Sequence, residues 1–403
     1  MRALAESWLA LIALMVLTIS GGLVSYPALG AVFVVTKEAD DNGICMPDDC
    51  ALREAVIAAE ASPGEDSIVL PAGIYPLTLG AQNPNVVAGG DLDIRDDLTV
   101  ASDEGATIVG SGDNSVIFIE GAMVKLEGLT VTGGRFSEGG GLWLVEADVT
   151  IANCWVTGNE GTVDAGGISL ILGRLEIVDS TISGNTASRR GGAIKRLSIS
   201  DNFPSTLIIR NSTISGNSAR EGGAISSSGG GGEFRIENST IANNPVRNFG
   251  SVVFLFIGTL PTFVNSVLEG DCSYSAQPPI SEGGNVDGPG ETFCNLDHPT
   301  DLPAQPNLGL LPLGDYGGLT PTHALSPASP AVDHALADAC PDADQRGEPR
   351  PVDGDGDGIA QCDAGAFELQ DPGAPAIPAL SLVAALVFGG LLAVAGVAAL
   401  RRS

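Results

Sequence analysis

The chain has 403 residues, of which 54 are glycine, and its 49 acidic residues outnumber 19 basic residues to give a formal net charge of −30. Such a surface repels nucleic acid and anionic membranes, so we expect no nucleic-acid partner. The acidic surface favours solubility and divalent cations instead.

Residues 1–30 are predicted to be a secretory signal peptide. Arg2 supplies a positive charge, residues 9–17 form an apolar segment, and residues 28–30 form a small-residue cleavage site. The alternative is an uncleaved membrane anchor, but the apolar run is short and residues 20–22 interrupt it. The sequence therefore predicts an exported protein.

Residues 31–64 are predicted to form an N-terminal cap. Leu52, Ala55, Val56 and Ala59 share one face of a short amphipathic helix, and Pro63-Gly64 ends it. Such a helix covers the open end of a repetitive core, which needs a cap to stay soluble and to hide its strand edge.

Residues 65–300 contain a short pattern that recurs six times. The copies start 25, 26, 32, 27 and 27 residues apart, which is typical of a solenoid whose repeats bury their apolar faces against one another. The extra residues in the longest repeat are predicted to form an outward loop. The copies start at Leu126, Ile151, Ile177, Ile209, Ile236 and Phe263.

The aligned repeats contain two apolar columns with a polar column between them. The β-branched bias of the apolar columns favours strands, and stacked parallel strands bring the same position of each coil together. We therefore predict an all-β fold, a right-handed parallel β-helix. The polar column is predicted to bend the backbone in the left-handed region and to form an asparagine ladder. Its members are Gly128, Asn153, Asp179, Asn211, Asn238 and Asn265.

Residues 301–373 form a separate C-terminal segment that carries the strongest metal candidate. Asp353, Asp355 and Asp357 alternate with glycine, and such carboxylates can converge on one hard cation. The sequence predicts a Ca²⁺ site there. The alternative is a solvated acidic turn, because Ala364 stands where an EF-hand loop has its bidentate glutamate.

Residues 374–403 are predicted to anchor or sort the protein. Residues 379–400 are almost entirely apolar and long enough to span a bilayer as one transmembrane helix. Arg401-Arg402 closes this run, and the basic end is expected to stay cytoplasmic. The rest of the chain is then expected outside the cell.

Seven cysteines in an exported chain suggest disulfides. The expected pairs are Cys45 with Cys50, Cys272 with Cys294, and Cys340 with Cys362, although spacing alone leaves the connectivity open. Cys154 lies inside a repeat and is predicted to be a buried thiol. The alternative for all seven is reduced, packed cysteine.

One dense basic cluster interrupts the acidic chain: Arg189, Arg190, Lys195 and Arg196. It suits a groove for acidic polysaccharide, and the alternative is a repeat turn whose charges keep it in water. No nucleophile–histidine or metal–histidine motif is visible in the sequence, so no catalytic residue is predicted. The acidic side chains placed in the turns, whose spacing the sequence cannot give, are Glu160, Asp164 and Glu221.

Three segments carry a family resemblance. CALREA at residues 50–55, after FVVT at 33–36 and DDNG at 40–43, resembles the start of the CSLREA-domain proteins, with Ala51 in place of serine. Residues 308–369, with GGLTPTHAL, SPAVD, DQRG and CDAGAFE, resemble the choice-of-anchor Q segment. IPALS at residues 377–381, followed by the apolar span and two arginines, is similar to an IPTL-type sorting signal, with Ala379 in place of threonine.

The resemblance implies an exported bacterial right-handed β-helix protein that is anchored or processed at its C-terminus, in a family with no established enzymatic role. We expect a structural, adhesive or carbohydrate-binding protein without a catalytic site. Expected partners are an extracellular polysaccharide or a neighbouring surface, the export or sorting machinery, and the membrane through residues 379–400. The alternatives are a secreted polysaccharide lyase or glycoside hydrolase of the same fold and, third, an autotransporter passenger.

Overall fold

The structure is a computed structural model that describes residues 30–80, 90–199, 202–250, 252–275, 277–289 and 294–370. The predicted signal peptide, apart from Gly30, and the apolar run 379–400 lie outside the described residues. Among the helices of the described ranges, none is long and apolar enough to cross a membrane.

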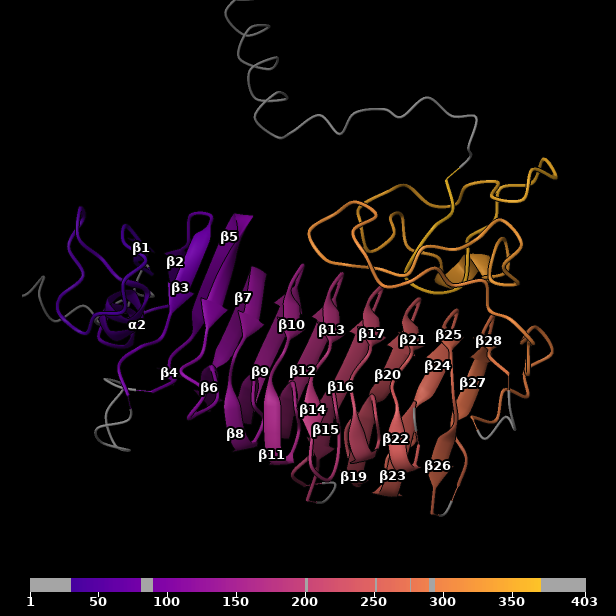
Figure 1. Ribbon diagram of the computed structural model, residues 1–403, viewed down its shortest axis with the longest axis horizontal. Coiled ribbons are helices and arrows are strands. Elements are labelled where there is room, and N and C mark those ends of the chain that lie inside the picture. Colours follow the sequence, from indigo (N-terminus) through magenta and orange to yellow (C-terminus); the bar gives the residue numbers. More distant parts are fainter. Residues whose placement is uncertain are drawn as a thin grey trace, which may run out of the picture.

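The chain coils into a stack of parallel strands whose faces enclose one apolar core (Figure 1). The first face contains β1 (Val32–Val34), β2 (Asp66–Val69), β5 (Leu98–Val109), β7 (Met123–Thr132), β9 (Leu142–Ala152), β12 (Ile168–Val178), β16 (Ser205–Arg210), β20 (Phe234–Glu237), β24 (Thr262–Val264) and β27 (Ile280–Gly283). β5 and β7 continue round a bend into the second face, whereas β9 and β12 enter the first face from the third.

The second face contains the later halves of β5 and β7 with β3 (Gly73–Pro76), β10 (Trp155–Thr157), β13 (Thr181–Ser183), β17 (Thr213–Ser215), β21 (Thr240–Ala242), β25 (Val267–Leu268) and β28 (Val286–Asp287). The third face contains the early halves of β9 and β12 with β4 (Leu92–Ile94), β6 (Ile117–Glu120), β15 (Ile194–Leu197), β19 (Ile225–Gly229), β23 (Val253–Gly258) and β26 (Cys272–Tyr274). A narrow strip between these two faces contains β8 (Arg135–Glu138), β11 (Glu160–Asp164), β14 (Thr186–Ala187), β18 (Ala219–Glu221) and β22 (Val246–Phe249).

The register confirms the predicted columns and the parallel β-helix. Ile177 is aligned with Ile151 on one side and Ile209 on the other, and Ile182 is aligned in the same way with Val156 and Ile214. All of these side chains are fully buried. Identical positions therefore stack coil upon coil and build the core, as the repeat predicted.

The polar column makes the predicted bend, but the prediction that it is the asparagine ladder is wrong. Its residues have φ between 46° and 66°, in the left-handed region. This backbone turns the side chains outward, and among the described residues only Asn211 bonds to the next member of the column, Asp179 (2.6 Å). Asn238 and Asn265 instead donate to carbonyl groups of the C-terminal segment (2.9 and 3.0 Å).

The true ladder begins six residues after the bend. Asn159 donates from Nδ2 to Asn185 Oδ1, Asn185 to Asn217 and Asn217 to Asn244, each at 3.0 Å. These four amides are buried, so the ladder satisfies polar groups that have no access to water. A parallel column of serines accepts backbone N–H bonds in the same way, as when Ser212 Oγ accepts from Ser180 N (3.1 Å).

The predicted N-terminal helix is confirmed as α2 (Leu52–Glu60), which contacts β4 and β2 at the first coils. Its predicted apolar face, Leu52, Ala55, Val56 and Ala59, is buried. Arg53 is also buried: it pairs with Asp40 (2.8 Å) and donates to the carbonyl groups of Asp91 (2.7 Å) and Gly90 (3.0 Å). Glu54 accepts from Ala51 N (2.7 Å) and thereby holds the start of the helix.

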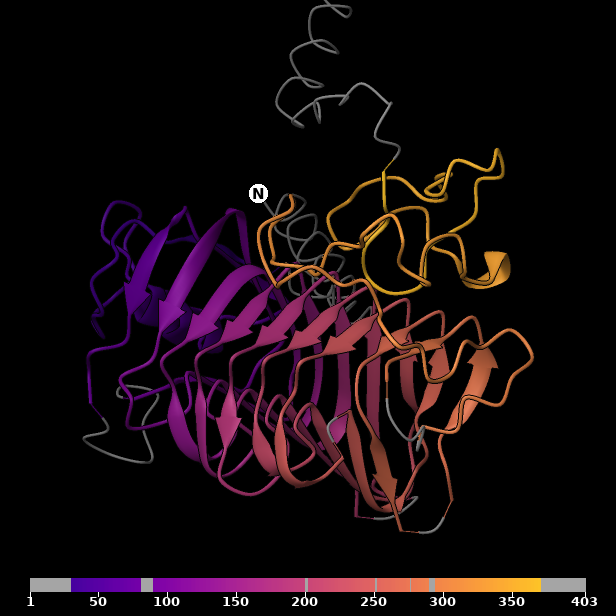
Figure 2. The same ribbon diagram turned by 45° about the vertical axis from the view of Figure 1, so that its right-hand side comes forward.

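The C-terminal segment lies along the outside of the second face over the later coils (Figure 2). It has little regular structure beyond the short 3-10 helix η1 (Ala337–Ala339). Gln345 Nε2 donates to Thr181 Oγ1 (2.8 Å), and Thr213 donates to Gln345 Oε1 (2.6 Å). A second apolar cluster, which includes Val267 and Phe367, joins the segment to β25.

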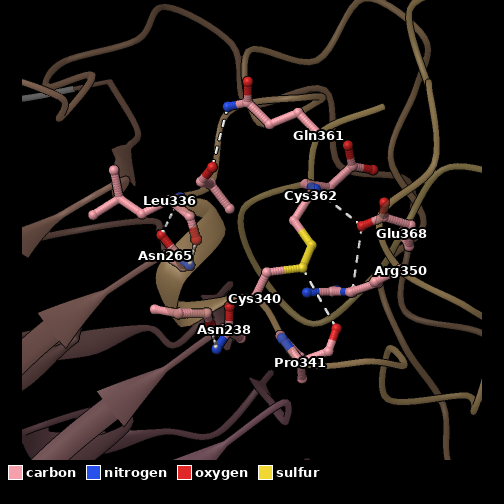
Figure 3. The surroundings of a disulfide bond; sticks show 12 residues. Asn238, Asn265, Leu336, Cys340, Pro341, Arg350, Gln361, Cys362 and Glu368 are labelled. Atoms are coloured by element: carbon pink, nitrogen blue, oxygen red, sulfur yellow. Dashed lines mark hydrogen bonds and ion pairs between the residues drawn. A yellow bond between two sulfur atoms is a disulfide. The ribbon is translucent and has the colours of Figure 1, made fainter. Parts of the chain in front are cut away.

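The three expected disulfides, Cys45–Cys50, Cys272–Cys294 and Cys340–Cys362, are confirmed, and Cys154 is a buried free thiol. Burial raises the pKa of the Cys154 thiol to about 12. The last disulfide lies beside the ion pair of Arg350 and Glu368 (Figure 3). It therefore links the C-cap of η1 to Cys362, in the last part of the described C-terminal segment.

Candidate functional site

The basic cluster divides into side chains with different surroundings. Lys195, on the outward side of β15, lies 2.6 Å from Glu138 Oε2 and 2.9 Å from Asp164 Oδ2. Arg189 binds the same Asp164 with two bonds, from Nε (3.0 Å) and Nη2 (2.8 Å). Asp164 is fully buried, so these two cations compensate a carboxylate that would otherwise be costly to bury. We call Glu138, Asp164, Arg189 and Lys195 the charged cluster.

The other two basic residues of the sequence motif lie elsewhere. Arg190 pairs with Glu221 (3.1 Å) in the adjacent turn. Arg196 points into the interior of the coil, where it is fully buried and donates to Ser205 O (2.9 Å from Nε) and Ser227 Oγ (3.0 Å). Burial lowers the pKa of Arg196 to about 10. The alternative that all four charges lie in water is wrong for Arg196, because the alternation of β15 turns its side chain inward.

The acidic side chains expected in the turns are all engaged. Glu160 pairs with Arg135 (3.0 Å), Asp164 belongs to the charged cluster, and Glu221 pairs with Arg190. Their partners come from neighbouring coils, 25 to 31 residues away in sequence. These carboxylates therefore neutralise cations between coils.

An aromatic patch, which no sequence motif indicated, lies on the third face and the adjoining strip. Phe118 and Trp143 have ring centroids 4.6 Å apart, and Phe136 lies 5.2 Å from Trp143. Phe118 is aligned with Trp143, Trp143 with Ser169 and Ser169 with Lys195, so Phe118, Trp143 and Lys195 share one column of the third face, in which Phe118 and Ser169 are buried. The third ring and the other members of the charged cluster lie in or beside the narrow strip. Arg95 covers Phe118 at 5.3 Å. The stacked register of Phe118 and Trp143 was the available sequence signal.

A hollow of about 410 Å³ runs across the narrow strip beside this face. Its lining includes the charged residues Glu160 and Arg247 and small residues from several coils; the small residues are Gly161, Ala187, Ser188, Ser218 and Ala219. Because successive coils stack about 4.8 Å apart, a hollow lined by several coils extends along the axis of the solenoid. Together, the aromatic patch, the charged cluster and this hollow form the candidate site.

The acidic loop of the C-terminal segment makes a second candidate site. Ligand oxygens of Asp353, Asp355 and Asp333 lie within 4.8 Å of one another, whereas Asp357 lies outside this group. Asp333 precedes the motif by a whole loop and was not identified from sequence. Asp353 also accepts backbone N–H bonds from Gly356 (2.8 Å) and, through its other oxygen, from Gly358 (2.8 Å). Burial raises the pKa of Asp333.

The structure contains a serine–histidine pair that no sequence motif indicated. His323 Nε2 lies 2.8 Å from Ser215 Oγ, and its Nδ1 lies 2.6 Å from the carbonyl oxygen of Leu311. Ser215 and His323 are each only 2% exposed. Such burial suits a contact that holds the C-terminal segment to β17 better than it suits a nucleophile.

Comparison with known proteins finds one family model and a similar solved structure. A family model described as the right-handed beta helix region matches residues 100–266. The crystal structure of pectate lyase Pel9A is similar at 14% sequence identity and a TM-score of 0.40, over 85% of this chain and 97% of that chain. No curated protein matches. The family model, together with the strand register, confirms the predicted right-handed parallel β-helix.

Proposed function

We propose that the protein is an exported, non-catalytic β-helix displayed at the cell surface, which binds extracellular polysaccharide along its third face. The observation that carries the proposal is the single column that holds Phe118, Trp143 and Lys195. Aromatic rings offer an apolar platform for sugar rings, and the neighbouring charges and hollow supply hydrogen-bonding groups.

The absence of catalysis is proposed from the state of the charged cluster. Lys195 is held between two carboxylates, and both bonds of Arg189 go to Asp164. A basic residue that takes a proton from a sugar needs access to that proton and a suitable pKa. Here the cations are engaged in ion pairs between coils, which supports a structural role for them.

Export is supported by the three disulfides, which persist in oxidising compartments. Display at the surface would follow from residues 374–403, as a membrane span through 379–400 or as a signal read by the sorting machinery. We further propose that Asp353, Asp355 and Asp333 bind Ca²⁺, with Asp357 beside them in the loop.

The test is binding and depolymerisation on a panel of acidic and neutral polysaccharides, with calcium or with chelator. We expect a bound polysaccharide and no product. Trp143→Ala should weaken binding, whereas Trp155→Ala, on the second face, should leave it unchanged with circular dichroism unaltered. Equal affinity of wild type and Trp143→Ala would contradict the proposed face.

A polysaccharide lyase is the second candidate, and one observation favours it. Lys195 and Arg189 meet two carboxylates where the third face joins the narrow strip. Basic and acidic side chains of these types can serve as general bases and acids in proton abstraction from an acidic sugar. Product in the depolymerisation assay would establish this class. Lys195→Met and Arg189→Met with unchanged activity would then exclude the charged cluster as its site.

A further inference from the structure

The longest repeat of the solenoid builds one wall of a separate hollow. The repeat that starts at Ile177 has 32 residues before the next, against 25 to 27 for the others. Its extra loop is held to the preceding coil by the bond from Gly173 N to Pro204 O (3.2 Å). The two ends of the loop are joined by the bond from Ser198 Oγ to Phe203 O (3.0 Å). Insertions in repeat proteins commonly map to loops on a binding face.

This hollow has a volume of about 360 Å³ and lies at the turn between the third and first faces. The loop contributes Asn202 and Phe203, and the coils opposite contribute Glu146, Asp148 and Arg174. The Phe203 side chain is 58% exposed, although aromatic residues are only 5% of the chain. An exposed ring beside a few convergent polar groups is the usual composition of a small-ligand site.

Two residues with large side chains have a strained, left-handed backbone at this turn. Glu146 and Leu172, which both line the hollow, have φ of 51° and 62°. One coil earlier, Gly121 holds the aligned position with φ of 70° and no side chain. A bulky residue rarely takes this conformation, and such positions gather at functional sites.

The charged residues that line the hollow indicate which class of ligand it can bind. Glu146 and Asp148 are both exposed acceptors, whereas Arg174 already pairs with Glu176 (2.6 Å). The local charge is therefore negative, which repels uronic acids. Carboxylate oxygens accept from hydroxyl groups, the Asn202 amide both donates and accepts, and the Phe203 ring offers an apolar face. The geometry points to a binding site for a neutral saccharide, and we propose that this hollow takes one sugar unit or a short neutral oligosaccharide.

This site is independent of the third-face proposal, because it uses other residues. The test is saturation-transfer difference NMR and calorimetry of the protein with lactose, maltose and cellobiose, and with galacturonic acid as the acidic probe. We expect binding of at least one neutral disaccharide and none of galacturonic acid. Phe203→Ala should weaken binding about tenfold, since it removes the stacking face.

Ile199→Ala is the matched control, because Ile199 is 66% exposed in the same loop and does not line the hollow. It should bind as wild type does, and so should Trp143→Ala on the third face. No binding of any neutral disaccharide would overturn the proposal. So would binding of galacturonic acid alone, or an equal loss in Phe203→Ala and Ile199→Ala.

Discussion

Ser215, on the outer side of β17, donates its hydroxyl to Nε2 of His323, 108 residues later in the chain, at 2.8 Å. The tautomer follows from the other ring nitrogen, because the Leu311 carbonyl can only accept and Nδ1 must donate to it. Burial lowers the pKa of His323 and so favours the neutral imidazole, in which Nδ1 carries the proton and Nε2 accepts from Ser215. This contact fixes the C-terminal segment to the solenoid.

His323→Ala should loosen that segment. The change leaves the Ser215 hydroxyl buried without its partner and opens a cavity where the ring was packed, so we expect a loss of about 2–3 kcal/mol in the free energy of unfolding. Urea denaturation measures the loss, and limited proteolysis should cut first within residues 301–370. His298→Ala is the control, because the His298 ring bonds with neighbouring Thr300 on the surface, while the backbone bonds of His298 with Asp301 survive the change. Equal stability of the two variants would contradict the docking role.

Asp287→Asn should reduce the pH dependence of stability. Asp287, on β28, is buried, and desolvation raises its pKa to about 7. A carboxyl with a raised pKa keeps its proton longer when folded than when unfolded. Its contribution is therefore complete below about pH 4 and is lost as the pH rises to about 7. Relative to wild type, the variant should gain roughly 2–4 kcal/mol across that window in urea titrations.

A constant difference between wild type and Asp287→Asn from pH 4 to pH 7 would contradict the assignment. The comparison must be made between the two proteins, because His323 acts in the opposite direction. Its lowered pKa means that the unfolded chain binds the proton more readily, so stability falls as the pH drops below about 6.5. This term is common to both proteins and cancels.

The two asparagine columns should differ sharply under mutation. Asn217→Ala removes the Nδ2 bonds to Asn244 Oδ1 (3.0 Å) and Ile182 O (2.8 Å) in the core, with an expected cost of about 2–4 kcal/mol. Asn153→Gly should be neutral within about 0.5 kcal/mol, since glycine takes its φ of 52° freely. Thermal denaturation compares them. A large loss of stability in Asn153→Gly would instead indicate that the column of residues at the bend forms the stabilising ladder.

That contrast shows what the sequence could and could not reveal. The coil register follows from sequence because like residues meet like residues in parallel strands, as Ile182 meets Ile214. The ladder was misplaced because asparagine recurs both at the bend and six residues later, and only the backbone path decides which points inward. Asparagine suits either place, through its left-handed φ at the bend or its two-sided amide in the core.

The candidate sites were predicted less completely, because their members come from distant segments. Lys195 and Glu138 are 57 residues apart, and Gln345 reaches Thr181 across 164 residues. The alternating aspartates are visible as a sequence motif. Asp333 lies in an earlier turn, and only the folded chain brings it next to them. The local sequence pattern predicts the acidic loop, whereas tertiary packing determines that Asp333 is the third carboxylate of the group.

The acidic loop should bind Ca²⁺ weakly. Three carboxylates can offer oxygen ligands, but backbone N–H groups already occupy part of the Asp353 and Asp355 oxygens, so we expect a dissociation constant of about 10⁻⁴–10⁻³ M. Calorimetric titration measures it. Asp333→Asn should abolish the heat, and Asp357→Asn should retain most of it. No heat from the wild-type protein would remove the calcium proposal.

Arg53→Met should damage the N-terminal cap far more than an exposed arginine would. Arg53 is fully buried with Asp40, which also accepts from Thr78 N (2.7 Å), so the substitution strands a carboxylate inside the cap. We expect a loss of about 3–5 kcal/mol and aggregation through the uncovered first coil. Arg95→Met is the matched control, because its pairs with Asp93 and Glu120 lie at the surface and contribute under about 1 kcal/mol. Urea unfolding and light scattering of both variants decide the point, and a soluble, stable Arg53→Met protein would show that α2 caps the solenoid without this ion pair.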